Sequence, residues 1–354
     1  MAADAFLGEP SAPEPTARTV LGPVAASALG FVLPHEHLIV DNRLHHVPAD
    51  GLDPDGPVSI DRLADVRVRP HAVRANLVLD DDASVTADLV AYRELGGMSL
   101  VELTPRGMGR DPTRLARFAR ASGVRVIAGT GYYVAHCHGD AVAGRSTEDI
   151  TKELVADLTG PDPGAGVIGE IGISVEEHAD EWRVLDAALA ASRQTGAPVF
   201  IHQTTTAPMR RILDHLERAG ADPARVVLCH ADYDLRDTTL HRAALAMGLT
   251  VEFDLFGMPL WGRGNWIHAP SDTLRVARLL ELAADGHAER LLMSQDVCMK
   301  VQLRAYGGFG YGHLLRNVRE LFDTLGGDEA TWRTITIRNP ARLLAWQSPV
   351  SRAR

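Results

Sequence analysis

Six side chains that can bind metal ions stand directly after short apolar runs of this sequence. Four are imidazoles and two are carboxylates: in chain order, His35, His37, Glu170, His202, His230 and Asp296. One histidine after a strand is usually an ordinary core residue, but six such residues at equivalent places favour a metal site. Imidazoles and carboxylates without a thiolate suit Zn²⁺, Mn²⁺, Co²⁺ or Fe²⁺. Because six ligands exceed what one tetrahedral zinc uses, we expect two divalent ions, with Zn²⁺ first among the candidates.

The spacing of the first two histidines indicates how these ligands are divided. Residues i and i+2 of a strand point to the same face, so His35 and His37 enter the site together. Glu36 lies between them and points the other way, so we expect it to be structural. We assign the six ligands to two ions that share a bridge: His35, His37 and Asp296 to one ion, His202 and His230 to the other, and Glu170 to both.

The apolar runs that precede these ligands predict strands separated by helices. Eight runs lie at residues 31–33, 97–103, 124–128, 166–169, 197–201, 225–229, 249–253 and 290–294. Amphipathic stretches between them predict helices at 84–95, 112–122, 146–158, 176–195, 208–219, 237–247 and 271–284. This alternation predicts an α/β protein with a (β/α)8 barrel, whose site forms at the carboxyl ends of the strands. A doubly wound open sheet is the rival fold, but the phosphate-binding glycine loop typical of it is missing.

Composition and charge restrict the kinds of partner. The chain has 354 residues, of which 45% are hydrophobic and 23% charged, as in a globular protein with a substantial core. Its net charge of −10 at pH 7 argues against nucleic acid or an anionic membrane surface as a partner. No run approaches 18 apolar residues, so a transmembrane helix is not expected. We therefore expect a small-molecule substrate.

The N-terminal segment and the cysteines bear on domains and location. Residues 1–17 are rich in Ala, Pro and Glu and are expected to form a disordered tail, with one domain over 18–350. The tail lacks the basic and apolar segments of a secretory signal. The three cysteines, Cys137, Cys229 and Cys298, lie far apart, which favours a reducing compartment. We expect a cytoplasmic protein.

The motifs around the six ligands resemble those of a known family. The stretches GFVLPHEHLIVD (30–41), VFIHQ (199–203), VVLCHAD (226–232) and LLMSQDVC (291–298) are similar to the phosphotriesterase-like family of the amidohydrolase superfamily. Where the best-known members carry a carboxylated lysine, this chain has Glu170, and neither of its two lysines, Lys152 and Lys300, can replace it. It thus resembles the phosphotriesterase-related and phosphotriesterase homology proteins. Relatives of this kind are commonly homodimers, which the residues themselves leave open.

The ligand set and the resemblance predict a hydrolase. A hydroxide shared by two ions would attack an ester, lactone or amide carbonyl, with promiscuous phosphotriester hydrolysis as an extension, and Asp296 would accept the proton. We expect four residues to contact substrate. The resemblance suggests Tyr133 and Cys298, the glycine-punctuated loop after the seventh strand supplies Trp261, and Arg275 could meet an anionic group. For Tyr133 and Cys298 plain packing explains the residue equally well, and for Arg275 a helix-surface position does.

Two other functions stay open at this point. A deaminase of the same superfamily would use one metal ion, and a barrel without catalysis would bind a small ligand. The tract His136-Cys137-His138 contains metal-binding residue types, but a third metal site is not expected there, and His45 and His46 are expected to be solvated. Asp232 is expected either to orient His230 or to cap a helix. The long segment 41–82 is expected to form a wall of the active site or an oligomer contact.

Overall fold

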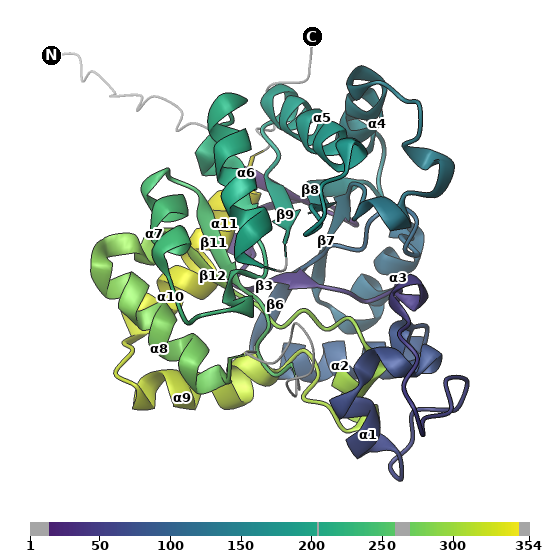
Figure 1. Cartoon of the computed structure of the whole chain (residues 1–354). Helices are drawn as coiled ribbons and strands as arrows, with labels where there is room; N and C mark the ends of the chain where they lie inside the picture. The colour runs from purple at the N-terminus through teal and green to yellow at the C-terminus, as the bar shows by residue number, and fades with distance from the viewer. Residues whose placement is uncertain (1–13, 204, 259–269, 347–354) are drawn as a thin grey trace, which may run out of the picture.

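Eight parallel strands surrounded by helices make up the protein, as the barrel prediction requires (Figure 1). The computed structural model describes residues 14–203, 205–258 and 270–346. The sheet order is β12-β11-β10-β9-β8-β7-β6-β3. Its strands, in chain order, are β3 (Phe31–Glu36), β6 (Gly97–Glu102), β7 (Arg125–Thr130), β8 (Ala165–Gly172), β9 (Val199–His202), β10 (Val226–Leu228), β11 (Thr250–Phe253) and β12 (Leu291–Met293).

The first and last strands close the barrel beside the predicted ligands. The backbone N–H of Asp296 donates to the carbonyl oxygen of His35 at 3.2 Å. The Ser294 hydroxyl donates to the same carbonyl at 2.9 Å and accepts from the His35 N–H at 3.0 Å. A side chain therefore supplies part of the pairing that a regular ladder would supply by backbone alone.

The helices follow the strands in alternation, and the sequence marks several of their ends. They are α2 (Asp82–Glu94), α3 (Pro112–Ser122), α4 (Thr147–Thr159), α5 (Ala179–Thr195), α6 (Thr206–Arg218), α7 (Thr239–Ala246) and α8 (Asp272–Leu282). Asp111 and Ser146 accept backbone N–H groups at the starts of α3 and α4. Gly123 and Gly196 end α3 and α5 in the left-handed conformation that glycine adopts without strain.

The barrel interior is filled by one small set of apolar side chains. Inward positions of successive strands supply Val32, Val101, Ile127, Val167, Phe200, Val227 and Leu292, all at most 1% exposed. β11 is the exception, because its residue paired with Leu292 is Glu252, which is also fully buried. Both faces of these strands are buried, one in the barrel interior and the other under the helices, which explains why the strands read as continuous apolar runs.

The N-terminal hairpin packs against the barrel. It consists of β1 (Thr16–Thr19) and β2 (Gly22–Ala25), paired antiparallel, with Ala17 fully buried. β1 thus includes Thr16 and Ala17, the last two residues of the segment 1–17 that the sequence assigned to a tail. At the other end, α9 (Arg319–Thr324), α10 (Glu329–Arg333) and α11 (Asn339–Leu344) follow β12, and Leu343 and Leu344 join the interior cluster.

The segment 41–82 folds into short elements next to β3. It begins with β4 (Val40–Asp41), which pairs with β5 (Val78–Leu79), and it carries α1 (Leu63–Val68) between several 3-10 turns. Figure 1 places α1 outside the ring of barrel helices, near α2. None of the helices that the structure describes combines the length and the apolar character needed to span a bilayer.

Candidate metal centre

The structure brings all six sequence-predicted ligands together at the carboxyl ends of the strands, and we call this group the metal rim. Glu170 lies in the middle. Its Oε1 is 2.9 Å from Nδ1 of His202 and 3.0 Å from Nε2 of His230. Its Oε2 is 3.7 Å from Nε2 of His37. Asp296 Oδ1 is 3.2 Å from the same His37 nitrogen. Five strands separated along the chain therefore deliver their polar side chains to one place.

The donor atoms of His35 fit a metal ligand. Its Nδ1 lies 3.1 Å from Glu252 and 3.2 Å from Asp254, so the proton is held on that nitrogen. Its Nε2 is fully buried and has no hydrogen-bond partner among the described residues. Glu170 and Asp296 lie 3.6 and 3.9 Å from it, too far for hydrogen bonds. A buried ring nitrogen without a hydrogen-bond partner, close to two carboxylates, suits a ligand of a bound cation.

Buried charges shift the pKa values of these groups strongly. Burial by itself would raise the pKa of Glu170, but the imidazoles of His35 and His202 outweigh it and hold that pKa well below its usual range. Burial would likewise lower the pKa of His35 and His230, yet Asp254 raises both well above the usual value. The carboxylates of this site thus require positive charge close by.

Two carboxylates at the end of β11, Glu252 within the strand and Asp254 directly after it, support the rim from behind. Asp254 accepts from Nδ1 of His230 at 2.8 Å and from the His230 backbone N–H at 2.9 Å. Glu252 accepts from His35 as described above. Such contacts fix the ring orientation and leave Nε2 directed at the site. The sequence interpretation missed this pair, although Glu252 and Asp254 have the same i, i+2 spacing as His35 and His37.

Asp232 and Arg275 lie behind Asp254 and hold it in place. Asp232 accepts from the backbone N–H groups of Asp254 and Leu255 and from the guanidinium of Arg275 at 2.7 Å. It therefore positions Asp254, which in turn orients His230. Arg275 is 1% exposed and forms this buried ion pair behind the rim. The structure does not bring Arg275 to the cavity, so a contact with an anionic substrate group is not supported, nor is a place on the helix surface.

Glu36 and Thr104 hold the ends of β12 and β3. Glu36 accepts from the Ser294 hydroxyl at 2.8 Å and from the N–H groups of Gln295 and Val297 at 2.9 Å. It is fully buried, and burial raises its pKa to about 8. Thr104 lies 2.8 Å from Nδ1 of His37. The structural role expected for Glu36 matches these contacts.

Two rim residues have strained backbones. His230 and Asp296 have φ values of 52° and 46°, and they are the non-glycine residues with positive φ in the described part of the chain. Left-handed backbone costs a non-glycine residue about 1 kcal/mol or more and persists only where its surroundings hold it. Both residues are predicted ligands, which is the kind of place where such strain accumulates.

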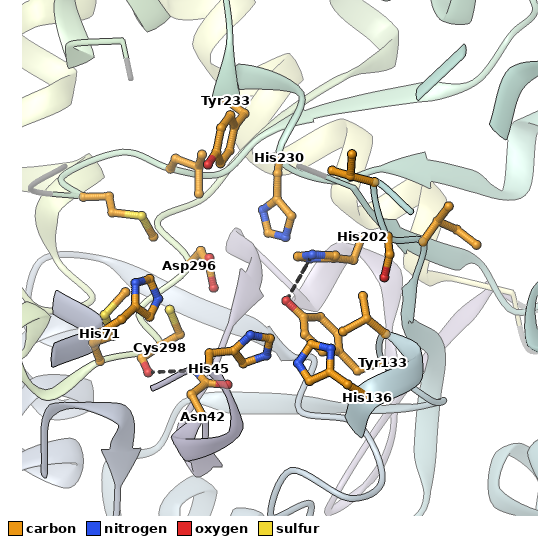
Figure 2. A pocket seen from close by; sticks show the side chains of 17 residues that line it. Asn42, His45, His71, Tyr133, His136, His202, His230, Tyr233, Asp296 and Cys298 are labelled. Atoms are coloured by element: carbon orange, nitrogen blue, oxygen red, sulfur yellow. Dashed lines mark hydrogen bonds between the residues drawn. The ribbon is translucent and has the colours of Figure 1, made fainter. Parts of the chain in front are cut away.

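A cavity of about 310 Å³ opens above the metal rim. His202, His230 and Asp296 face it from the rim (Figure 2). We give the name cavity wall to six of the other residues around it: Asn42, His45, His71, Tyr133, His136 and Cys298. Asn42, His45 and His71 come from the segment 41–82, which therefore forms a wall of the cavity.

The remaining predicted substrate contacts have different placements. Tyr133 is half-buried in the wall, and its hydroxyl lies 3.1 Å from Nε2 of His202. Cys298 is 9% exposed and lines the cavity next to Asp296. Trp261 lies outside the described residues. The wall histidines His45 and His71 were not expected to line a site, because the sequence gives no sign of how segment 41–82 folds back.

Comparisons with known proteins agree with this geometry. The model of the phosphotriesterase family matches residues 15–344. An N-acetyltaurine hydrolase of Xenopus tropicalis is 32% identical over 93% of this chain and 98% of its own length. A resiniferatoxin-binding protein from Rhodobacter sphaeroides is 34% identical, with a TM-score of 0.90 over 94% of this chain and 96% of that one. A phosphotriesterase-like lactonase of Deinococcus radiodurans, in mutant form, is 28% identical, with a TM-score of 0.73 over 93% and 100%.

These matches separate the functions that the sequence left open. The relatives are named for hydrolysis of an amide or a lactone, which favours the hydrolase over the deaminase and over a barrel without catalysis. The fold, the rim and the motifs point the same way. The chain belongs to the phosphotriesterase family, and it is a metal-dependent hydrolase of ester, lactone or amide bonds.

Proposed function

We propose that this hydrolase cleaves the amide bond of a small N-acyl amine that carries an anionic group, with N-acetyltaurine as the representative substrate. The observation that carries this is a buried rim of six ligands beneath a cavity of about 310 Å³, in a chain that aligns with N-acetyltaurine hydrolases over nearly its whole length. A cavity of that volume suits a small ligand. Among the described residues no lysine or arginine lines it, so the wall imidazoles and the amide of Asn42 are the groups available to the anionic part of the substrate.

We propose two divalent ions, with zinc as the preferred metal. Charge balance supports this number, because four carboxylates in or directly behind the rim carry up to four negative charges: Glu170, Glu252, Asp254 and Asp296. Buried charge of that size is stable only when it is neutralised. Glu170 supports the bridging role, since its two oxygens face different imidazoles. Bound ions of this kind supply an activated water at neutral pH and polarise the carbonyl group.

The chain's own groups then handle the proton and the substrate. Asp296 is the carboxylate that faces the cavity, so its Oδ atoms accept the proton released by the attacking water and deliver it to the leaving nitrogen. The Tyr133 hydroxyl, at the edge of His202, donates to the acyl oxygen or to the leaving group. Cys298 packs beside Asp296 and limits the size of the acyl part.

The test is a substrate panel on protein whose metal content has been measured. N-acetyltaurine, an aryl ester, a lactone and a phosphotriester are compared, with taurine release followed directly. We expect the highest kcat/KM for N-acetyltaurine and two equivalents of zinc per chain. A clear preference for the lactone or the ester would contradict the proposed substrate, and one metal equivalent in the active protein would contradict the proposed site.

We further propose a reducing compartment such as the cytoplasm. Cys137, Cys229 and Cys298 are all buried and unpaired in the structure. Disulfides are a feature of oxidising compartments, so three free thiols support this location. Microscopy of a tagged chain in its own host tests it.

A further inference from the structure

Away from the metal rim, one other group of metal-binding side chains comes together in the described part of the chain. It consists of His45, His136 and Cys137, whose donor atoms all lie within 4.8 Å of one another. The Cys137 sulfur is 3.7 Å from Nε2 of His45, and the His45 and His136 rings are 4.7 Å apart between centroids. Figure 2 shows His45 and His136 next to each other in the cavity wall.

Two loops from distant parts of the chain build this cluster. His45 ends a 3-10 turn, Arg43–His45, in the segment 41–82, and Cys137 ends another, Ala135–Cys137, after β7. The Cys137 backbone is fixed by close packing, because a Cβ on Gly107 would lie 2.7 Å from the Cys137 carbonyl oxygen. Gly107 itself has a φ of 85°, which favours glycine. The thiol therefore sits on a constrained backbone.

The cluster is separate from the metal rim. The Tyr133 ring lies between the two, with centroid distances of 5.7 Å to His45 and 4.5 Å to His202. His138 is directed elsewhere, since its Nε2 bonds the carbonyl oxygen of Tyr133 at 2.7 Å. The tract His136-Cys137-His138 thus does not act as a unit, and His45 takes the place that the sequence would give to His138.

The donor set and the spacing match a soft divalent cation. In a tetrahedral zinc site the bond lengths to imidazole and thiolate place nitrogen and sulfur about 3.6 Å apart. The His45–Cys137 separation of 3.7 Å is close to this value. No carboxylate belongs to the cluster. Two imidazoles and one thiolate favour Zn²⁺ over Mg²⁺ or Mn²⁺.

We propose that His45, His136 and Cys137 form a third, mononuclear metal site, specific for zinc or a similar soft cation, in the wall of the catalytic cavity. His45 and His136 line the cavity, so the fourth position of the ion faces it and takes a water molecule or a ligand group. On binding, the Cys137 thiol loses its proton to solvent as the metal–sulfur bond forms.

The protonation states of the free cluster agree with this. Burial, with the neighbouring His136 and His202 imidazoles, lowers the pKa of His45 to about 4, so its nitrogen lone pair is available at neutral pH. Burial raises the pKa of Cys137 to about 12, so the thiol stays protonated until a cation displaces the proton. Without a metal, the pair is an ordinary thiol–imidazole contact.

Cobalt titration of the full-length, metal-stripped protein distinguishes a metal site from that contact. Cobalt bound by a thiolate absorbs strongly in the near ultraviolet, whereas cobalt bound only by imidazoles and carboxylates does not. We expect this band to appear with one cobalt per chain beyond the rim ions. Cys137→Ser is expected to abolish the band, while Cys298→Ser, which alters the thiol beside Asp296, is expected to keep it. A band missing from the wild type, or one that persists in Cys137→Ser, would overturn the proposal.

A second pair of variants keeps the test valid if Cys137→Ser does not fold. His45→Asn removes a proposed ligand, and His46→Asn removes the adjacent histidine of the same loop. We expect His45→Asn to weaken the extra cobalt at least tenfold and His46→Asn to leave its affinity unchanged. Equal affinities in the two variants would contradict the site. The readout is metal binding, so it does not depend on the substrate proposed above.

Discussion

The metal rim and the cavity wall are neighbours, but their side chains are held in different ways. In the rim, His35, His37 and His230 each have their Nδ1 atom fixed by a buried acceptor. In the wall, the described residues give the His71 and His136 side chains no hydrogen bond, and the Cys137 thiol is the only hydrogen-bond partner they give the His45 ring. The rim residues lie in barrel strands or within three residues of a strand's end, whereas the wall residues lie in loops. The comparison suggests that the rim determines whether reaction occurs and the wall determines which substrate reacts.

Metal removal should have the largest effect, because it acts on the whole rim. Stripping with a chelator is expected to abolish turnover and to lower the free energy of unfolding by about 3 kcal/mol or more, since bound ions stabilise only the folded state. The measurements are thermal unfolding and amide hydrolysis before and after addition of zinc. Unchanged activity in stripped protein would place catalysis outside the rim.

The substitution Glu170→Gln tests the centre of the rim. It removes the negative charge between the imidazoles, so kcat/KM should fall about 10³-fold or more. Metal content measured by elemental analysis should fall as well. Glu148→Gln, at an exposed helix position, is the control and should behave as wild type. Two tightly bound zinc ions in Glu170→Gln would show that another group forms the bridge.

The substitution Asp254→Asn tests whether the support behind the rim matters. The amide cannot take the place of the carboxylate that orients His230, so metal affinity or activity should fall about 10–100-fold. Asp323→Asn, a surface carboxylate on α9, serves as the comparison. If both variants retain the full metal affinity, the hydrogen bonds that orient the rim histidines do not affect metal binding, which would contradict the distinction drawn between rim and wall.

The substitution Glu36→Gln acts on the connection between β3 and the end of β12. The N–H₂ group of the glutamine would face hydroxyl and N–H groups that now donate to Glu36, and two donors cannot form a hydrogen bond with each other. We therefore expect a loss of about 2 kcal/mol in the free energy of unfolding. Denaturant unfolding measures this. Activity per folded, metal-loaded molecule should fall much less than for Asp254→Asn, because Glu36 does not touch a ligand side chain. A stability equal to wild type would contradict the role given to these three hydrogen bonds.

The substitution Tyr133→Phe should have the smallest effect on metal content and a selective effect on turnover. It removes one hydroxyl at the wall, so kcat/KM should fall about 10-fold, which corresponds to one hydrogen bond, with both ions retained. The control is Tyr132→Phe, whose hydroxyl instead bonds Glu153. A loss of metal in Tyr133→Phe would mean that the wall and the rim are one unit.

The sequence predicts the fold and the convergence of the six candidate ligands because both follow local rules. Apolar runs of strand length, with helices between them, lead to the barrel, and polar residues at the strand ends meet at one rim by topology alone. His35 and His37 need only the alternation of a strand. Glu252 and Asp254 have the same i, i+2 spacing. They were missed because the prediction considered only side chains that could bind a metal ion, and not the carboxylates that orient those side chains.

The contacts within the wall could not be predicted in this way, although a wall was one of the two roles expected for segment 41–82. The contact of His45 with Cys137 depends on how two irregular loops fold, and no periodicity describes their path. The prediction that Arg275 contacts substrate failed for a related reason. An arginine in an amphipathic helix is expected to be accessible, but Arg275 forms a buried ion pair with Asp232. Long-range ion pairs of this kind leave no trace in local sequence pattern.

The closure of the barrel has a consequence for how the protein matures. His35 and His37 lie on the first barrel strand, while Asp296 follows the last, and the hydrogen bonds of Ser294 join the two. A chain that has not yet reached Asp296 therefore lacks one of the six ligands and the hydrogen bonds that join the last strand to the first. The full set of six ligands exists only after synthesis has passed the eighth strand, so binding of both ions should be complete only in a fully synthesised and closed barrel.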